Sequence, residues 1–142
     1  MSRGYATSEE VSFIKEYVLI PIVLTVFERD SEVMKQALKS PQPYVDALGR
    51  GMDLATIELT HLKNFFRSRG IKVYEQKRNE VGISASYACR GYRGSLSLLW
   101  SLIAADVDIR KRRYLGENVE KILHESEKNL FLCTPPPFTS LY

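Results

Sequence analysis

Residues 71–105 read IKVYEQKRNEVGISASYACRGYRGSLSLLWSLIAA, and the fold class depends on how this stretch folds. Its first eight residues alternate apolar Ile71 and Val73 with less apolar neighbours, as a strand does. Beyond them, apolar side chains recur at helical spacing: Val81, Ala85, Ala88, Tyr92, Leu96, Leu99 and Ile103. Since residues 71–78 have no convincing second strand to pair with, we interpret them as a short extended linker and residues 79–113 as a helix. The alternative for residues 71–78 is an edge strand that pairs with its own copy in a dimer.

The preceding stretch, residues 44–66, carries one continuous apolar stripe at helical spacing. The stripe consists of Tyr44, Leu48, Met52, Ala55, Leu59, Leu62 and Phe66. Pro43 suits the first turn of a helix, and Gly70 is well placed as a left-handed C-cap. These signals predict a second helix that starts near Pro43 and ends just before Gly70.

The N-terminal part of the chain predicts a first helix over residues 8–38. Thr7 and Glu10 have the spacing of a capping box. Pro21 lies inside this helix and predicts a kink, because its ring removes one amide donor. The apolar run YVLIPIVLTVF covers only residues 17–27, whereas a spanning helix needs roughly 20 apolar residues. We therefore expect a core helix and no membrane span.

The C-terminal part predicts a short fourth helix over residues 117–130, with one largely apolar side. That side consists of Val119, Ile122, Leu123, Ser126 and Leu130. Together the segments predict an all-α fold, a three- to four-helix bundle with a kinked first helix and a short extended linker after the second. We predict a single helical domain over residues 1–142, with residues 1–7 and 132–142 as flexible tails.

Composition places the chain among ordinary globular proteins. Its 142 residues suffice for one domain, and 44% hydrophobic with 26% charged residues argues against wholesale disorder. A formal charge of +3 is too small to indicate a polyanionic partner by itself. Cys89 and Cys133 are too few for a disulfide framework and are typical of reduced thiols. Since the N-terminus also lacks the apolar stretch of a signal peptide, we expect a cytoplasmic protein.

Glu58 and His61 are the nearest approach to a catalytic or metal-binding motif. They match half of the Glu-x-x-His pattern of carboxylate-bridged metal sites in helical bundles. The second half is missing, because Lys121 stands three residues before His124. The sequence also has no P-loop, no nucleophile elbow and no dinucleotide-binding glycine motif. We therefore predict no catalytic residue, no metal, no cofactor and no enzyme activity.

Basic residues form two clusters, at residues 63–78 and 110–113, and indicate an alternative function. Gathered on one face, such side chains bind nucleic-acid phosphates. The candidate contacts are Lys63, Arg67, Arg69, Lys72, Lys77, Arg78, Arg110, Lys111, Arg112 and Arg113. Both clusters also lie at predicted helix ends, where cations interact favourably with the helix dipole. A nucleic-acid-associated regulatory protein is therefore the alternative prediction.

The main prediction is association with another protein, most simply as a homodimer. The apolar first helix, the small residues after residue 81 and the apolar tail exceed what three helices bury easily, and exposed apolar surface promotes association. A symmetric dimer needs only one self-complementary patch. We expect Trp100, Phe131 and Phe138 on this surface. The competing interpretation is that the fourth helix and the tail cover it within one molecule.

Five short segments follow one another in a distinctive order along the chain. They are IPIVLTVFERD at 20–30, PYVD at 43–46, IKV at 71–73, RNE at 78–80 and GY at 91–92. In this order they resemble a group of small uncharacterised proteins from Bacillus-type bacteria. The resemblance does not extend to the region around Trp100, the basic run after it or the Pro-rich tail. It implies a cytosolic bacterial protein and no particular activity, because these segments are packing and turn residues.

Overall fold

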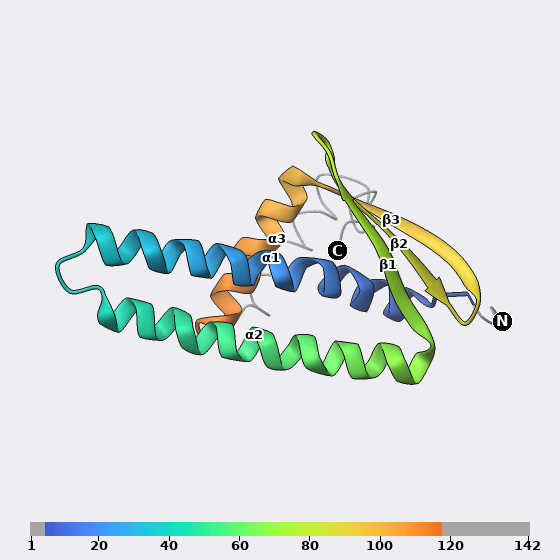
Figure 1. Ribbon diagram of the computed structural model, residues 1–142, viewed down its shortest axis with the longest axis horizontal. Coiled ribbons are helices and arrows are strands. Elements are labelled where there is room, and N and C mark those ends of the chain that lie inside the picture. Colours follow the sequence, from blue (N-terminus) through green and yellow to red (C-terminus); the bar gives the residue numbers. More distant parts are fainter. Residues whose placement is uncertain (1–4, 118–142) are drawn as a thin grey trace, which may run out of the picture.

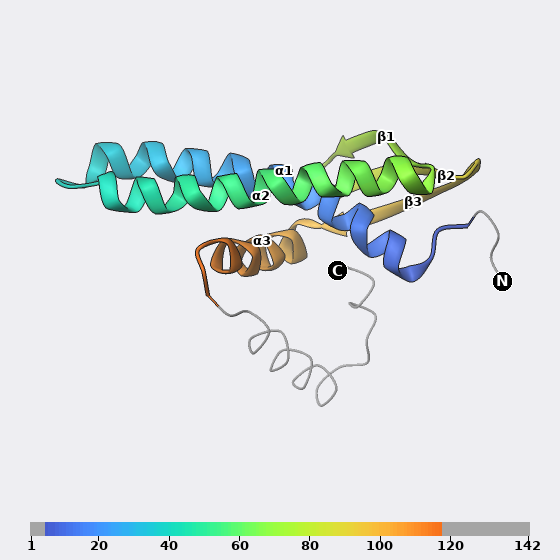
Figure 2. The same cartoon turned by 90° about the horizontal axis from the view of Figure 1, so that it is seen from below.

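The computed structural model describes residues 5–117, and within them the chain forms three helices and one three-stranded sheet (Figure 1). In chain order the elements are α1 (Ser8–Ala37), α2 (Gln42–Arg69), β1 (Ile71–Arg78), β2 (Gly82–Cys89), β3 (Tyr92–Leu99) and α3 (Trp100–Tyr114). The long helices α1 and α2 form an antiparallel hairpin, the sheet lies at one end of it, and α3 crosses it (Figures 1 and 2). The fold is therefore α+β.

The all-α prediction is wrong, and so is the helical bundle that it implied. Residues 79–99 were expected in a helix, but most of them form β2 and β3, and α3 begins only at Trp100. Residues 71–78, interpreted as a linker, are the strand β1, and its partner β2 lies in the same chain. The partner strand that the sequence analysis did not find is β2, because its small residues were assigned to a helix.

The sheet is antiparallel, in the order β1-β2-β3. Cys89 pairs with Tyr92 at the closed end of the β2–β3 hairpin. Arg90 and Gly91 form its two-residue turn, and both have positive φ, at 50° and 89°, as tight hairpin turns require. Burial in β2 alternates with period two, the mark of a strand with one face on the core. The buried side chains are Ile83, Ala85, Tyr87 and Cys89.

Both long helices lie close to where the sequence predicted them. The capping box of α1 is confirmed, since Thr7 N donates to Glu10 Oε1 at 3.0 Å and Glu10 N donates to Thr7 Oγ1 at 3.1 Å. Gly70 has a left-handed conformation at the end of α2, with φ 68°. Pro21 lies inside α1, and the N-terminal turns of this helix are inclined to the rest of it, as the proline predicts (Figure 2).

The core forms where the inner face of the sheet meets the helical hairpin. One buried cluster joins α1, α2 and the sheet through Ile14, Phe66, Ile71, Tyr87 and Cys89. A larger cluster continues along α1 to Phe27 and includes Tyr114 of α3. Within residues 5–117 no helix combines the length and apolarity that crossing a bilayer requires. The predicted helix over residues 117–130 and the tail over residues 132–142 lie outside the described residues, apart from residue 117.

Candidate association surface

The basic cluster at residues 110–113 is neutralised by acidic side chains of the same chain. The pairs are Arg110 with Asp106 and Glu16, Lys111 with Asp30, Arg112 with Asp108 and Glu117, and Arg113 with Glu58. The shortest joins Arg113 Nη2 to Glu58 Oε2 at 2.6 Å. Three of the four cations bind acids of α1 or α2, so this cluster fastens α3 to the hairpin.

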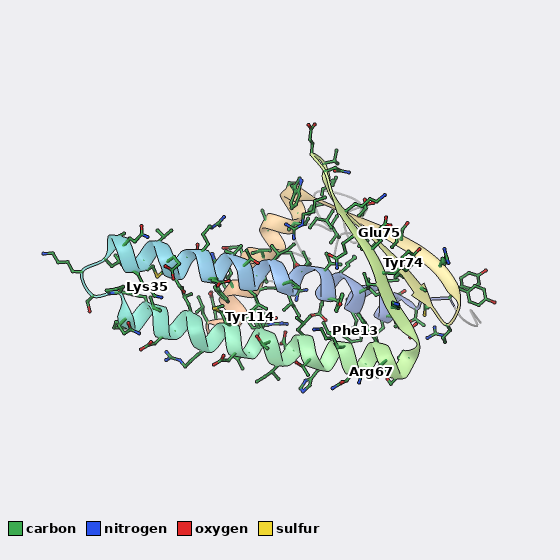
Figure 3. All side chains as sticks on the ribbon, in the orientation of Figure 1. Phe13, Lys35, Arg67, Tyr74, Glu75 and Tyr114 are labelled. Atoms are coloured by element: carbon green, nitrogen blue, oxygen red, sulfur yellow. The ribbon has the colours of Figure 1, made fainter. Side chains whose placement is uncertain are left out.

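The basic cluster at residues 63–78 is divided between ion pairs and exposed side chains. Arg69 pairs with Glu10, and Lys77 pairs with Glu75. The other four cations are exposed and have no ion-pair partner among the described residues: Lys63, Arg67, Lys72 and Arg78. Figure 3 shows Arg67 on the side of α2 that faces away from α1. Ion pairs within the chain therefore engage six of the ten predicted contacts.

A buried carboxylate at the N-terminal end of α1 was not anticipated as a charged site. Glu10 is fully buried, and Arg90 in the β2–β3 turn donates to both of its oxygens, at 2.9 and 3.0 Å. Arg69 Nη1 lies 3.4 Å from Glu10 Oε2. The hydrogen bonds from Arg90 outweigh burial and lower the pKa of Glu10 from 4.5 to about 2. Sequence spacing could not indicate this contact, because the two residues come from distant elements.

Cys89 is buried beside this carboxylate, with its Sγ 3.8 Å from Glu10 Oε1. Burial, followed by the nearby Glu10 carboxylate, raises the pKa of the thiol. A buried thiol whose pKa is raised is typical of a cysteine that packs in the core. Cys133 lies outside the described residues.

A second polar network lies between α1 and α3. Arg110 bonds Asp106 at 2.9 Å and Glu16 at 3.2 Å, and all three side chains are largely buried. Lys15 is buried too, and burial lowers its pKa while Asp106 opposes that shift. Among the described residues no buried side-chain nitrogen or oxygen lacks a hydrogen-bond partner. The network therefore positions α3 against α1.

A groove of about 340 Å³ lies between α1 and α2. Its apolar lining consists of Phe13, Ile20, Leu62 and Phe65, and its polar lining consists of Glu16, Glu58 and His61. Figure 3 places Phe13 between the two helices. The groove thus brings together side chains that are far apart in the sequence.

Glu58, half of the candidate metal-binding motif, forms hydrogen bonds with two side chains of α3. Its Oε2 accepts from Arg113 Nη2 at 2.6 Å and from Tyr114 Oη at 2.5 Å. Burial, followed by the Glu58 carboxylate, raises the pKa of Tyr114 to about 12, so its hydroxyl remains a donor. His61 is exposed. Within residues 5–117 no group of three acidic, His or Cys side chains is arranged to hold a metal ion.

The two edge strands differ in their protection against pairing with another strand. β1 carries the exposed cations Lys72 and Lys77, and its register shifts between Val73 and Glu75. Charges and bulges of this kind deter edge-to-edge pairing. β3 pairs with β2 in a regular register along its whole length, and Arg93 is its single charged residue. Among the described elements, β3 is therefore the edge that is least protected.

Trp100, predicted on an association surface, is half-buried at the start of α3. Its Nε1 donates to the carbonyl oxygen of Asn79 at 2.8 Å, and its side chain packs against the core. The contact holds the turn between β1 and β2 against α3. Phe131 and Phe138 lie outside the described residues.

In a comparison with protein families, residues 5–119 match a family model described as YhjD protein. The match includes the helical hairpin, the whole sheet, α3 and the groove. The family is one of uncharacterised proteins, so the match does not indicate which activity, if any, this chain has. Comparison with curated proteins found no match, and comparison with solved structures found none either.

Proposed function

This chain belongs to the YhjD protein family, and from that premise we propose that it is not an enzyme and acts by association with a second copy of itself. One observation carries the proposal: β1 is protected by charge and a bulge, and β3 is not. An unprotected edge strand is a ready template for another strand. We propose a homodimer in which the β3 strands of two copies pair.

At every second residue of β3, the backbone N–H and C=O groups point away from β2 and are available to a partner strand. In a hairpin with a two-residue turn, the flanking pair Cys89 and Tyr92 exchanges both hydrogen bonds, and bonded pairs alternate from there. The bond from Trp100 N to Val81 O, at 3.1 Å, follows the same alternation. The backbone groups that point away from β2 therefore belong to Arg93, Ser95, Ser97 and Leu99.

A two-fold axis near Leu96 would satisfy these groups in an antiparallel pairing. Arg93 would then face Leu99 of the second copy, and Ser95 would face Ser97, so that the four residues bond their counterparts. The serines keep the middle of β3 free of bulky side chains on its outer face, and Leu99, 43% exposed, adds apolar contact at each end. Two three-stranded sheets would join into one.

The mass of the full chain in solution, measured by native mass spectrometry and sedimentation velocity over a range of concentrations, tests this proposal. We expect a dimer whose population rises with concentration. Ser95→Pro removes one outward amide of β3 and should give a monomer. Gln76→Pro is the matched control on the other edge: the bond from Asn79 N to Gly82 O, at 3.0 Å, implies that the Gln76 amide also points outward. This variant should still dimerise.

Ser95→Lys provides a second test, because it places like charges near the proposed axis, and it should also give a monomer. Circular dichroism of the three variants verifies that each retains its sheet. The proposal is contradicted if the unchanged chain remains a monomer at every concentration, or if Gln76→Pro loses the dimer as Ser95→Pro does.

Nucleic-acid binding, the alternative, has less support in the arrangement of charges. The cluster at residues 110–113 pairs with acids, whereas phosphate binding requires accessible cations. Four exposed cations, on α2 and β1, remain in its favour: Lys63, Arg67, Lys72 and Arg78. A nucleic-acid complex would dissociate as salt rises, whereas the mass of the proposed dimer should depend little on salt.

The cytoplasm of a Bacillus-type bacterium is the location that we propose for this protein. The location rests on the cysteine content, which is typical of reduced thiols, and the source rests on the resemblance described above.

A further inference from the structure

We infer that residues 118–130 of this chain dock in the groove between α1 and α2, as a helix that runs antiparallel to α3. The inference is independent of the proposed dimer, which uses a different surface. It rests on the lining of the groove, on the place where α3 ends, and on the sequence of the segment that follows.

The lining of the groove suits an apolar helix face. The rings of Phe13 and Phe65 meet edge to face, with centroids 4.9 Å apart, and Ile20 and Leu62 complete the apolar part. The two carboxylates in the lining already pair with arginines of α3. The groove therefore presents apolar surface without an unpaired carboxylate, and it favours an apolar occupant over a cation.

The last two turns of α3 lie beside this groove. Arg110 Nη1 lies 3.2 Å from Glu16 Oε1, and Arg113 Nη2 lies 2.6 Å from Glu58 Oε2. Both carboxylates belong to the groove lining. The chain therefore leaves α3 next to one end of the groove, close to Glu58.

The end of α3 has the geometry that reverses a chain. Gly116 N donates to Arg113 O at 3.0 Å, and Glu117 N donates to Arg112 O at 2.9 Å. With Gly116 at φ 98°, these bonds form a Schellman motif. A tight reversal after a helix places the next helix antiparallel beside it. A helix that returned beside α3 on this side would cross both α2 and α1 over the groove.

The segment that follows has the amphipathic pattern that such docking requires. Residues 118–130 read NVEKILHESEKNL. Val119, Ile122, Leu123 and Leu130 share one face, and Lys121 and Lys128 lie on the opposite face. Thirteen helical residues extend about 20 Å, which is enough to cross two helices packed 8–10 Å apart. This chain therefore supplies a segment that fits the groove in length and pattern.

Cross-linking of the full chain tests the position of the segment. His61 lines the groove, and Lys63 is an exposed residue about 160° away around α2. We combine Ser126→Cys with either His61→Cys or, as the control, Lys63→Cys, in a chain that also carries Cys133→Ser. Buried Cys89 is retained, because it is inaccessible to the reagent. A short bismaleimide should join the His61→Cys pair about tenfold faster than the control pair, since docking raises the effective concentration of the two thiols.

The mass of the cross-linked product separates the outcomes. A product with the mass of one chain and a strong preference for the His61→Cys pair supports the inference. Equal rates for the two pairs, or a product with the mass of two chains, would overturn it. The second result would assign the groove to the segment of another copy.

A pair of glutamine variants tests whether the apolar face causes the docking. In the His61→Cys background, Leu123→Gln should abolish the rate preference, because it places an amide against the apolar lining. Lys128→Gln, on the opposite face of the segment, should retain it. Equal effects of the two substitutions would overturn the assignment of the docking face.

Discussion

The two ends of the α1–α2 hairpin are fixed very differently, although the same two helices form both. At the sheet end, Glu10 is fully buried and bonded by Arg90. At the far end, which projects beyond α3, Val33 and Tyr44 are each 58% exposed, and Lys35 makes only a surface pair with Glu32 (Figures 1 and 3). The comparison teaches that contacts between distant segments, rather than the helices themselves, decide where this molecule is stable.

Removal of one carboxylate from each end should have unequal effects, and this is the largest difference that we predict. Glu10→Ala removes the capping box and the bonds from Arg90, and it should lower the free energy of unfolding by about 3 kcal/mol. Glu32→Ala, the matched control at the far end, removes an exposed pair and should change stability little. Urea unfolding followed by circular dichroism measures both. Similar losses for the two variants would contradict the comparison.

The sheet end should also be the end that is sensitive to acid. The pKa of Glu10 is lowered from 4.5 to about 2 in the folded state. The resulting stability is therefore fully present above about pH 5 and is lost as pH falls toward 2, by about 3 kcal/mol in all. Glu10→Gln cannot titrate, so its stability should fall less over this range. The idea fails if urea unfolding at pH 5 and pH 2.5 gives equal losses for Glu10→Gln and the unchanged chain.

The sequence predicted the hairpin well because its signals are local. Thr7 and Glu10 form the expected capping box, and Gly70 ends α2 as expected. The sheet was missed because its central strand consists largely of small residues, whose apolar members also recur at helical spacing. Its turn was hidden as well, since Arg90 adopts the positive φ that is usually found for Asn, Asp or Gly.

The polar sites were less predictable than the helices, because their partners come from distant parts of the chain. Arg113 was a candidate phosphate contact, and its partner Glu58 lies on another helix. Glu10 was read only as a capping residue, although Arg90 binds it. A cluster of cations in the sequence therefore does not indicate whether these side chains lack acidic partners in the folded protein. The contrast between β1 and β3, by comparison, depends on residues within each strand, but it becomes apparent only once the sheet is known.

Two glycines of α2 give the smallest and most local form of the comparison. A Cβ at Gly51 would lie 3.3 Å from a ring carbon of Phe27 and 3.4 Å from Cβ of Tyr114, whereas a Cβ at Gly49 would meet nothing within 4 Å. Gly49→Ala should therefore raise the free energy of unfolding by up to about 1 kcal/mol through helix propensity. In Gly51→Ala, crowding at the crossing of α3 should offset that gain and leave the protein about 1 kcal/mol less stable. Thermal and urea unfolding of the two variants measure the difference. Equal stabilisation of both variants would mean that the side chains of Phe27 and Tyr114 do not crowd residue 51. The tightly packed part of the hairpin would then end nearer the sheet than the crossing with α3.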